Sequence, residues 1–122
     1  MRTFQFVLIA ALAIPFAAQA ADDASSPGAT PSATVTQCYE RLQKRVPKRT
    51  AYTAIHATDE QLAAGMIERW EQAFTPRLST VVSTRVLIDA TGTRGGKSLP
   101  VILKCGLNGD KIVTWEIEQK RN

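Results

Sequence analysis

The chain has 122 residues, of which 15 are basic and 11 acidic, so its formal net charge is +4 at neutral pH. This length suits one small domain with a limited core, and we expect no second domain. A modest positive charge favours anionic partners over cationic ones.

The first twenty residues have the pattern of an export signal. Arg2 precedes an apolar run from Phe4 to Phe16, and the small residues Ala18 and Ala20 give the Ala-x-Ala pattern of a cleavage site. We predict a signal peptide over residues 1–20 that is removed after Ala20. Removal takes away only one charged residue, which leaves 102 residues and a net charge of +3. The run is too short to span a bilayer, so we expect no transmembrane segment and a periplasmic or extracellular product.

Cys38 and Cys105 are the two cysteines, 67 positions apart. In an exported chain of this size they predict one intrachain disulfide. The separation excludes a Cys-x-x-Cys redox motif, and two thiols cannot supply a four-thiolate zinc site. Closing a loop of this length stabilises a fold by roughly 4 kcal/mol. Two buried free thiols or an intermolecular bridge are the alternatives.

A helix is predicted after a leader over residues 21–33, which we expect to be disordered because it is small, polar and turn-forming. A capping box formed by Thr34 and Gln37 marks its start, and Pro47 its end. Between them, apolar residues recur at helical spacing and predict a buried stripe. The stripe comprises Val35, Cys38, Tyr39, Leu42 and Val46.

Residues 49–56 are either an edge strand or a connector. A second helix is predicted over residues 58–74, with Thr58 as its cap, Gln61 completing a capping box, and Pro76 beyond its end. Its predicted buried side comprises Leu62, Met66, Ile67, Trp70, Ala73 and Phe74.

From residue 79 the apolar period changes to two, which indicates strands. Residues 79–90, 99–105 and 111–118 form three predicted strands, and residues 91–98 a loop. On the first strand, one face carries Val82, Thr84, Val86, Ile88 and Ala90. We therefore predict an α+β domain over residues 34–122, with two helices on one face of a three-stranded antiparallel meander.

Asn108-Gly109 predicts the last hairpin turn. A two-residue loop sets Leu103 opposite Thr114, which mixes apolar and polar residues on each face. A three-residue loop over 107–109 sets Leu103 opposite Val113, and it pairs Val101 with Trp115 and Leu99 with Ile117. We favour this second register because it gives one uniformly apolar face, with Cys105 on it. The other face then carries Pro100, Ile102, Lys104, Ile112, Thr114 and Glu116.

No catalytic, metal or cofactor site is predicted. His56 is the single histidine and has no nucleophile beside it in sequence. Glu68 and Glu71 lie at i, i+3 on the predicted second helix, where an exposed charged side explains them better than acid–base catalysis does. Asn108 and Asp110 offer too few oxygens for calcium. We therefore expect the protein not to be an enzyme.

Five basic residues within nine positions form a candidate anion-binding ridge on the first helix, and a second basic pair lies in the predicted loop. The ridge comprises Arg41, Lys44, Arg45, Lys48 and Arg49, and the pair at the loop tip is Arg94 and Lys97. Favourable interaction with the helix dipole and solubility explain the ridge equally simply. Nucleic acid is a poor candidate partner because few aromatic residues are free for stacking.

The C-terminal pattern Asp-x5-Gly-Gly-Lys-x2-Pro-Val and Leu-Lys-Cys-Gly-x2-Gly resembles small exported Gram-negative proteins of the BspC-domain type. It comprises Asp89, Gly95, Gly96, Lys97, Pro100, Val101, Leu103, Lys104, Cys105, Gly106, Gly109 and Ile112. The resemblance implies a periplasmic or secreted protein without an assigned catalytic residue. Our leading hypothesis is an exported, non-enzymatic interaction or accessory domain. The alternatives are a small secreted inhibitor or effector that acts on an envelope or host protein, and a hydrolase with an unrecognised site.

Overall fold

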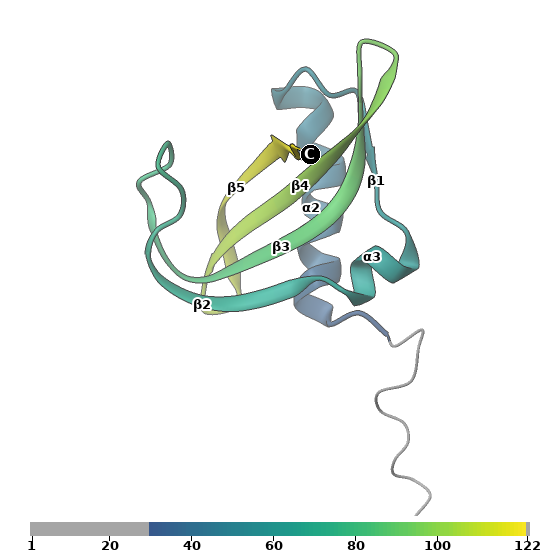
Figure 1. Cartoon of the computed structure of the whole chain (residues 1–122). Coiled ribbons are helices and arrows are strands. Elements are labelled where there is room, and N and C mark those ends of the chain that lie inside the picture. Colours follow the sequence, from purple (N-terminus) through teal and green to yellow (C-terminus); the bar gives the residue numbers. More distant parts are fainter. Residues whose placement is uncertain (1–29, 122) are drawn as a thin grey trace, which may run out of the picture.

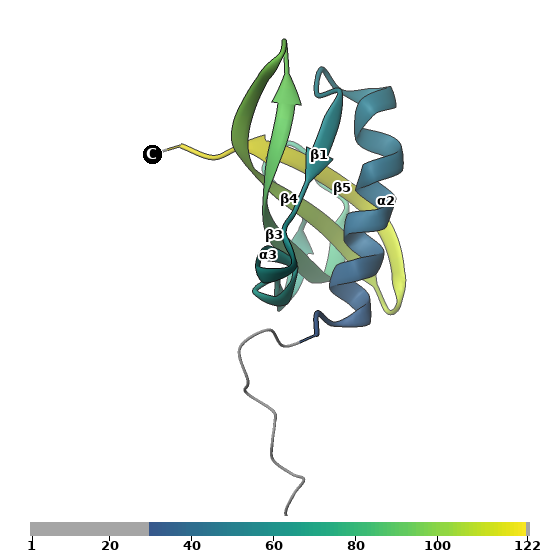
Figure 2. The ribbon, with the colours of Figure 1, turned by 90° about the vertical axis from the view of Figure 1, so that its right-hand side faces the viewer.

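The structure, a computed structural model, describes residues 30–121. These residues form a five-stranded antiparallel sheet with one long helix against it, α2 (Ala33–Arg49), and one short helix, α3 (Asp59–Ala63). Figure 1 shows the sheet, and Figure 2 shows α2 lying along one of its faces. The prediction of two helices on a three-stranded meander is wrong, because most of the predicted second helix is strand. The predicted signal peptide over residues 1–20 lies outside the described residues.

The strands are β1 (Ala54–His56), β2 (Met66–Ala73), β3 (Val81–Arg94), β4 (Lys97–Asn108) and β5 (Lys111–Gln119). β3 is the longest strand and pairs with three of the other four strands. β4 pairs along one side of it, while β1 and β2 pair with different halves of its other side. β5 pairs only with β4, so it forms an edge of the sheet. Residues 54–56 are thus a short strand, which decides between the two alternatives for residues 49–56.

Helix α2 buries the predicted apolar stripe against the sheet. All five stripe residues are buried, and they contact the core residues of β1, β3, β4 and β5. The helix begins earlier than predicted, because the Ser32 hydroxyl caps it by accepting a hydrogen bond from the Val35 amide at 3.1 Å. It also continues through Pro47 to Arg49, since the missing Pro47 amide falls in the exposed last turn and costs a single bond.

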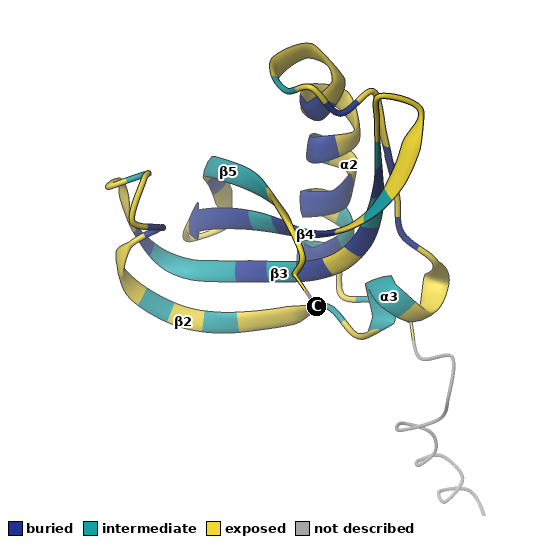
Figure 3. Cartoon of the chain, turned by 45° about the horizontal axis from the view of Figure 1, so that its top comes forward, coloured by how far each residue is buried: buried dark blue, intermediate teal, exposed yellow. Residues whose placement is uncertain are grey.

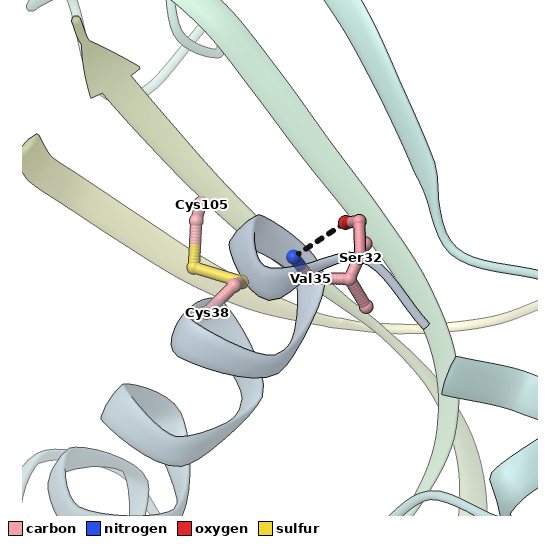
Figure 4. Close-up of a disulfide and its surroundings, with 4 residues drawn as sticks. All are labelled: Ser32, Val35, Cys38 and Cys105. Carbon is pink, nitrogen blue, oxygen red and sulfur yellow. Dashed lines mark hydrogen bonds between the residues drawn. A yellow bond between two sulfur atoms is a disulfide. The ribbon is translucent and has the colours of Figure 1, made fainter. Parts of the chain in front are cut away.

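The predicted disulfide between Cys38 and Cys105 is present and joins α2 to β4 (Figure 4). Both cysteines are fully buried, and their Cα atoms are 6.0 Å apart. Cys38 lies six residues, or nearly two helical turns, after the Ser32 cap, and Cys105 lies on the inner face of the sheet. The bridge therefore holds the start of the helix on the sheet.

The predicted helix over residues 58–74 ends after one turn. Its capping box is present, with Gln61 and Thr58 exchanging hydrogen bonds of 3.1 and 2.9 Å. Gly65 then weakens the helix, and a Cβ there would lie 2.9 Å from Val35 of α2. From Met66 the chain pairs with β3 instead. Of the six residues predicted to be buried only Phe74 is buried, and Met66 and Ile67 are exposed, because a strand at this edge has no helix beside it.

Residues 91–98, predicted as a loop, are mostly strand. β3 and β4 stay paired up to Arg94 and Lys97, and only Gly95 and Gly96 form the turn. Both glycines have positive φ, 60° and 77°, as a two-residue hairpin turn requires. On β3 the predicted alternation is confirmed from Val86 onward, since Val86, Ile88 and Ala90 are buried in the core cluster, whereas Val82 is buried next to Gly106 and outside this cluster.

The β4–β5 hairpin differs from both predicted registers. Asn108 pairs with Lys111, so the turn residues are Gly109 and Asp110. Asn108 stays in the strand because its side chain accepts a hydrogen bond from the Ser83 amide and donates one to the Val81 carbonyl. Val113 has no partner and forms a bulge, which lets Leu107 and Ile112 as well as Cys105 and Trp115 pair. Ile112 is therefore buried and Val113 is exposed, the reverse of the prediction.

Candidate functional site

The basic ridge of α2 follows one side of the helix. Its residues recur at spacings of three and four, which places them on one stripe about 12 Å long. Arg41 is half-buried at the start of this stripe, and the other four residues are exposed. The apolar stripe takes the side of the helix that faces the sheet, so the ridge faces solvent. Lys48 and Arg49 lie in the last turn, where cations also interact favourably with the helix dipole.

The ridge residues form no salt bridge within the part of the chain that the structure describes, whereas several cations of the sheet do. Arg85 contacts Glu68 at 2.6 Å, Lys104 contacts Glu118 at 2.6 Å, and Lys120 contacts Asp89 at 3.4 Å. Helix α2 carries five basic residues and one acidic residue, a net charge of +4. Residues 30–121 together contain 14 basic and 9 acidic residues, a net charge of +5. The helix thus carries most of the excess positive charge of the described chain.

The second predicted basic pair lies at the tip of the β3–β4 hairpin. Lys97 is exposed, and Arg94 is held in place by its neighbours. The Arg94 guanidinium donates to Gln119 Oε1 at 3.0 Å and lies 5.1 Å from the centre of the Tyr52 ring. Tyr52 is three residues beyond the last residue of α2, so this contact links the hairpin to the end of the helix.

The end of the ridge and the hairpin tip lie at the same end of the molecule. Figures 1 and 2 both place the C-terminal end of α2 beside the tip of the β3–β4 hairpin. We call Lys48, Arg49, Arg94 and Lys97 the basic pole. Residues 41–58 and 90–109, which include all four, contain no aspartate or glutamate. Two basic clusters that are far apart in the sequence thus lie at the same end of the molecule, and neither sequence segment contains a carboxylate.

The remaining predicted candidates do not form a site together. His56 is exposed at the end of β1. Glu68 and Glu71 lie on β2 rather than on a helix, and each contacts a different arginine, Arg85 and Arg69. Glu71 has a positive φ of 53° because it lies in the bulge of β2. Among residues 30–121 there is no group of three or more side chains suited to binding a metal ion.

An aromatic–cation cluster on the outer face of the sheet, the face away from α2, was missed by sequence reasoning. The Arg85 guanidinium lies 3.4 Å from the centre of the Trp70 ring. Glu68 Oε2 accepts two hydrogen bonds from the same guanidinium, at 2.9 and 2.6 Å. Because Glu68 and Trp70 are two residues apart, strand alternation would have placed them on one face. Because residues 58–74 were predicted to be helical, this strand alternation was not recognised in the sequence.

Two charged side chains outside this cluster, Glu118 and Arg77, have shifted pKa values. A hydrogen bond and the charge of Lys104 lower the pKa of Glu118. A hydrogen bond to Glu116 and its charge raise the pKa of Arg77, which stays charged. Neither shift is of the kind that prepares a group for proton transfer near neutral pH.

Comparisons with protein-family models, curated proteins and solved structures find no match to this chain. The resemblance to BspC-domain proteins therefore stays a prediction. Within residues 30–121, no helix combines the length and the apolar character that crossing a membrane requires.

Proposed function

We propose that this protein is an exported, non-enzymatic interaction domain that binds an anionic partner through the basic pole and the ridge leading to it. The observation that supports this most is the concentration of basic side chains in two segments without a carboxylate, 41–58 and 90–109. Positive charge that is not neutralised locally attracts anions and accelerates their association. The disulfide agrees with folding in an oxidising compartment.

Rigid support for the basic pole also favours binding. The disulfide and the buried apolar stripe fix α2, and eleven consecutive residue pairs hold β3 to β4 up to the turn. Arg94 is held further by Tyr52 and Gln119. Charged groups on such elements lose little conformational freedom when they meet a partner, which lowers the entropic cost of association.

Vesicles that contain phosphatidylglycerol, with pure phosphatidylcholine vesicles as the neutral reference, test this proposal. The pole variant Lys48→Gln/Arg49→Gln/Lys97→Gln should bind the anionic vesicles at least about tenfold more weakly, since each basic residue near such a surface contributes about 1 kcal/mol. The ridge variant Arg41→Gln/Lys44→Gln/Arg45→Gln should also bind more weakly. A polyglutamate peptide in place of vesicles distinguishes an acidic protein partner from a phosphate surface.

The matched control neutralises three exposed cations elsewhere: Arg69→Gln/Lys111→Gln/Arg121→Gln. It has the same net charge as the other two variants, so a general charge effect would weaken all three equally. Equal binding by all three variants, or binding as tight as that of the unmodified protein, would contradict a role for the basic pole. Circular dichroism and intact mass confirm that each variant is folded and oxidised.

A second candidate function, a secreted inhibitor or effector, is favoured by the shape of the β3–β4 hairpin. Its tip projects at one end of the molecule and is exposed (Figures 1 and 3). A projecting, regular hairpin is suited to insertion into a cleft of another protein. For this function we expect capture of a protein from envelope extract to require Arg94 and Lys97 but not Arg41, Lys44 and Arg45. Capture that survives Arg94→Ala/Lys97→Ala would contradict it.

A further inference from the structure

A cavity of about 320 Å³ lies beside the edge strand β5. Its lining combines apolar side chains with one carboxylate and comprises Thr50, Arg77, Leu78, Trp115, Glu116 and Ile117. Trp115 and Ile117 pack partly against the core and remain half-exposed. The cavity therefore offers an apolar wall next to an acidic group, which is the environment that suits a long aliphatic side chain with a cationic end.

Glu116 is incompletely satisfied within the described part of the chain. Its side chain is only 10% exposed, and Oε2 accepts a hydrogen bond from Arg77 at 2.6 Å. Oε1 is shut off from solvent and has no hydrogen-bond partner among residues 30–121. Lys104 is opposite Glu116 on β4, but its ammonium group contacts Glu118 instead. A buried carboxylate oxygen without a donor is unfavourable, so Glu116 can accept a further donor.

Arg77 is a displaceable partner for Glu116. Its side chain is 77% exposed, and it lies on the irregular segment between β2 and β3. The arginine end of this pair is open to water and salt, which compete with it, while the Glu116 end is buried and keeps its need for a cationic partner. A cationic group from outside that reaches the cavity can therefore replace Arg77 at small cost.

The backbone of β5 provides the second part of the site. β5 pairs only with β4, so among the described residues its outer edge has no strand partner. Glu116 and Glu118 lie on the outer face of β5, while Trp115 and Ile117 lie on the inner face. An added strand that alternates basic and apolar residues matches both faces. A second copy of β5 does not match, because antiparallel self-pairing would set acidic residues against each other.

We propose that β5 and this cavity form a binding edge for an extended peptide segment in which basic and apolar residues alternate. One arginine or lysine of the peptide takes the place of Arg77 at Glu116 on the outer face, and the apolar residues next to it in the peptide lie along Trp115 and Ile117 on the inner face. The peptide backbone adds to β5 as a further strand. This site shares no residue with the basic pole, so a negative result for one proposal would not contradict the other.

Titration with the peptide acetyl-Val-Thr-Val-Xaa-Val-Thr-Val-amide, in which Xaa and the valines lie on opposite faces of the strand, tests the proposal, with arginine, lysine, glutamine or glutamate at Xaa. We expect the arginine and lysine peptides to shift the amide NMR signals of β5, and the glutamine and glutamate peptides to bind at least tenfold more weakly. Glu116→Gln should lower the affinity for the arginine peptide by at least tenfold. Arg77→Gln should raise that affinity several-fold, because the internal competitor is removed.

The sign of the Arg77→Gln effect separates a displaceable partner from a structural one. Lower or unchanged affinity in this variant would overturn the proposal, as would equal binding of the glutamine peptide or no binding by any variant. Asp59→Asn is the matched control, since it removes an exposed carboxylate of α3 and leaves β5 unchanged, and we expect its affinity to stay within twofold. If sedimentation shows that Arg77→Gln dimerises through β5, a second copy is the occupant and the proposal is wrong.

Discussion

The two faces of the sheet differ in how they are stabilised. The inner face is apolar and covered by α2, with Val86, Ile88, Leu103 and Cys105 fully buried. On the outer face, β2 to β5 carry ion pairs such as Glu68–Arg85 and Lys104–Glu118, together with half-exposed apolar side chains. Figure 3 shows that buried residues line the side of α2 that faces the sheet, while β2 is largely exposed. Stability should therefore depend on the inner face, which leaves the outer face and the sheet edges available for partners.

Removal of the disulfide should have the largest effect on the inner face. We expect Cys38→Ala/Cys105→Ala to lower the free energy of unfolding by roughly 4 kcal/mol, because the reduced chain gains the entropy of a 67-residue loop. Urea unfolding followed by circular dichroism measures the change. The oxidised and reduced forms of the unmodified protein provide the control, and a loss below about 1 kcal/mol would show that α2 stays on the sheet without the bridge.

A matched pair of truncations compares the two faces directly. Leu42 of α2 is fully buried against the inner face of the sheet, whereas Met66 on β2 is 55% exposed. We expect Leu42→Ala to cost about 3 kcal/mol, as buried leucine truncations do, and Met66→Ala to cost less than about 1 kcal/mol. Urea unfolding of both variants under identical conditions checks this. Similar losses would mean that the outer face is covered in solution, for example by self-association.

Gly106 tests a tightly packed place on the outer face of the sheet. A Cβ at this position would lie 2.8 Å from side-chain atoms of Phe74, Val82 and Thr114. We expect Gly106→Ala to cost about 2 kcal/mol through overpacking. Thr114→Ser removes one of the three contacting atoms, the threonine methyl carbon, so the double variant should lose less than the sum of the single losses in thermal unfolding. Strict additivity would contradict a direct contact.

The contrast between the faces also explains which parts of the fold could be predicted from the sequence. Elements that face the core have one dominant environment, so the helical stripe of α2 and the alternation along β3 were predicted correctly. The disulfide followed from the cysteine count and compartment. β2 is exposed on most positions, and its apolar residues happened to fit a helical period. Pairing with β3 then decided its structure, and no local pattern contains that information.

Register and the candidate site depended on similar long-range contacts. The β4–β5 turn lies one residue later than predicted, because the Asn108 side chain accepts a hydrogen bond from the amide of Ser83, 25 positions away in the chain. The basic residues of both clusters were identified from the sequence. That they lie at the same end of the molecule could not be predicted, because it depends on long-range contacts such as that of Tyr52 with Arg94. Likewise, the sequence could not predict that Glu116 Oε1 lacks a hydrogen-bond partner among residues 30–121, because this depends on where the segment with Arg77 lies. Composition therefore predicted the candidate residues, and topology decided which of them act together.

The smallest predicted effect concerns the ion pairs of the outer face. The pKa of Glu118 is lowered by Lys104, so its stabilising contribution is present above the ordinary pKa range of glutamate and is lost as the pH falls through the lowered value. The Glu118 side chain is 53% exposed, and we expect Glu118→Gln to cost only about 0.5 kcal/mol or less at pH 7 and low salt. The variant and the unmodified protein should converge once the pH falls below the lowered pKa of Glu118, and also in 1 M salt. Glu40→Gln on α2 is the control and should change neither the pH dependence nor the salt dependence of unfolding, whereas an equal change in both variants would show that net charge rather than the Lys104 pair is responsible.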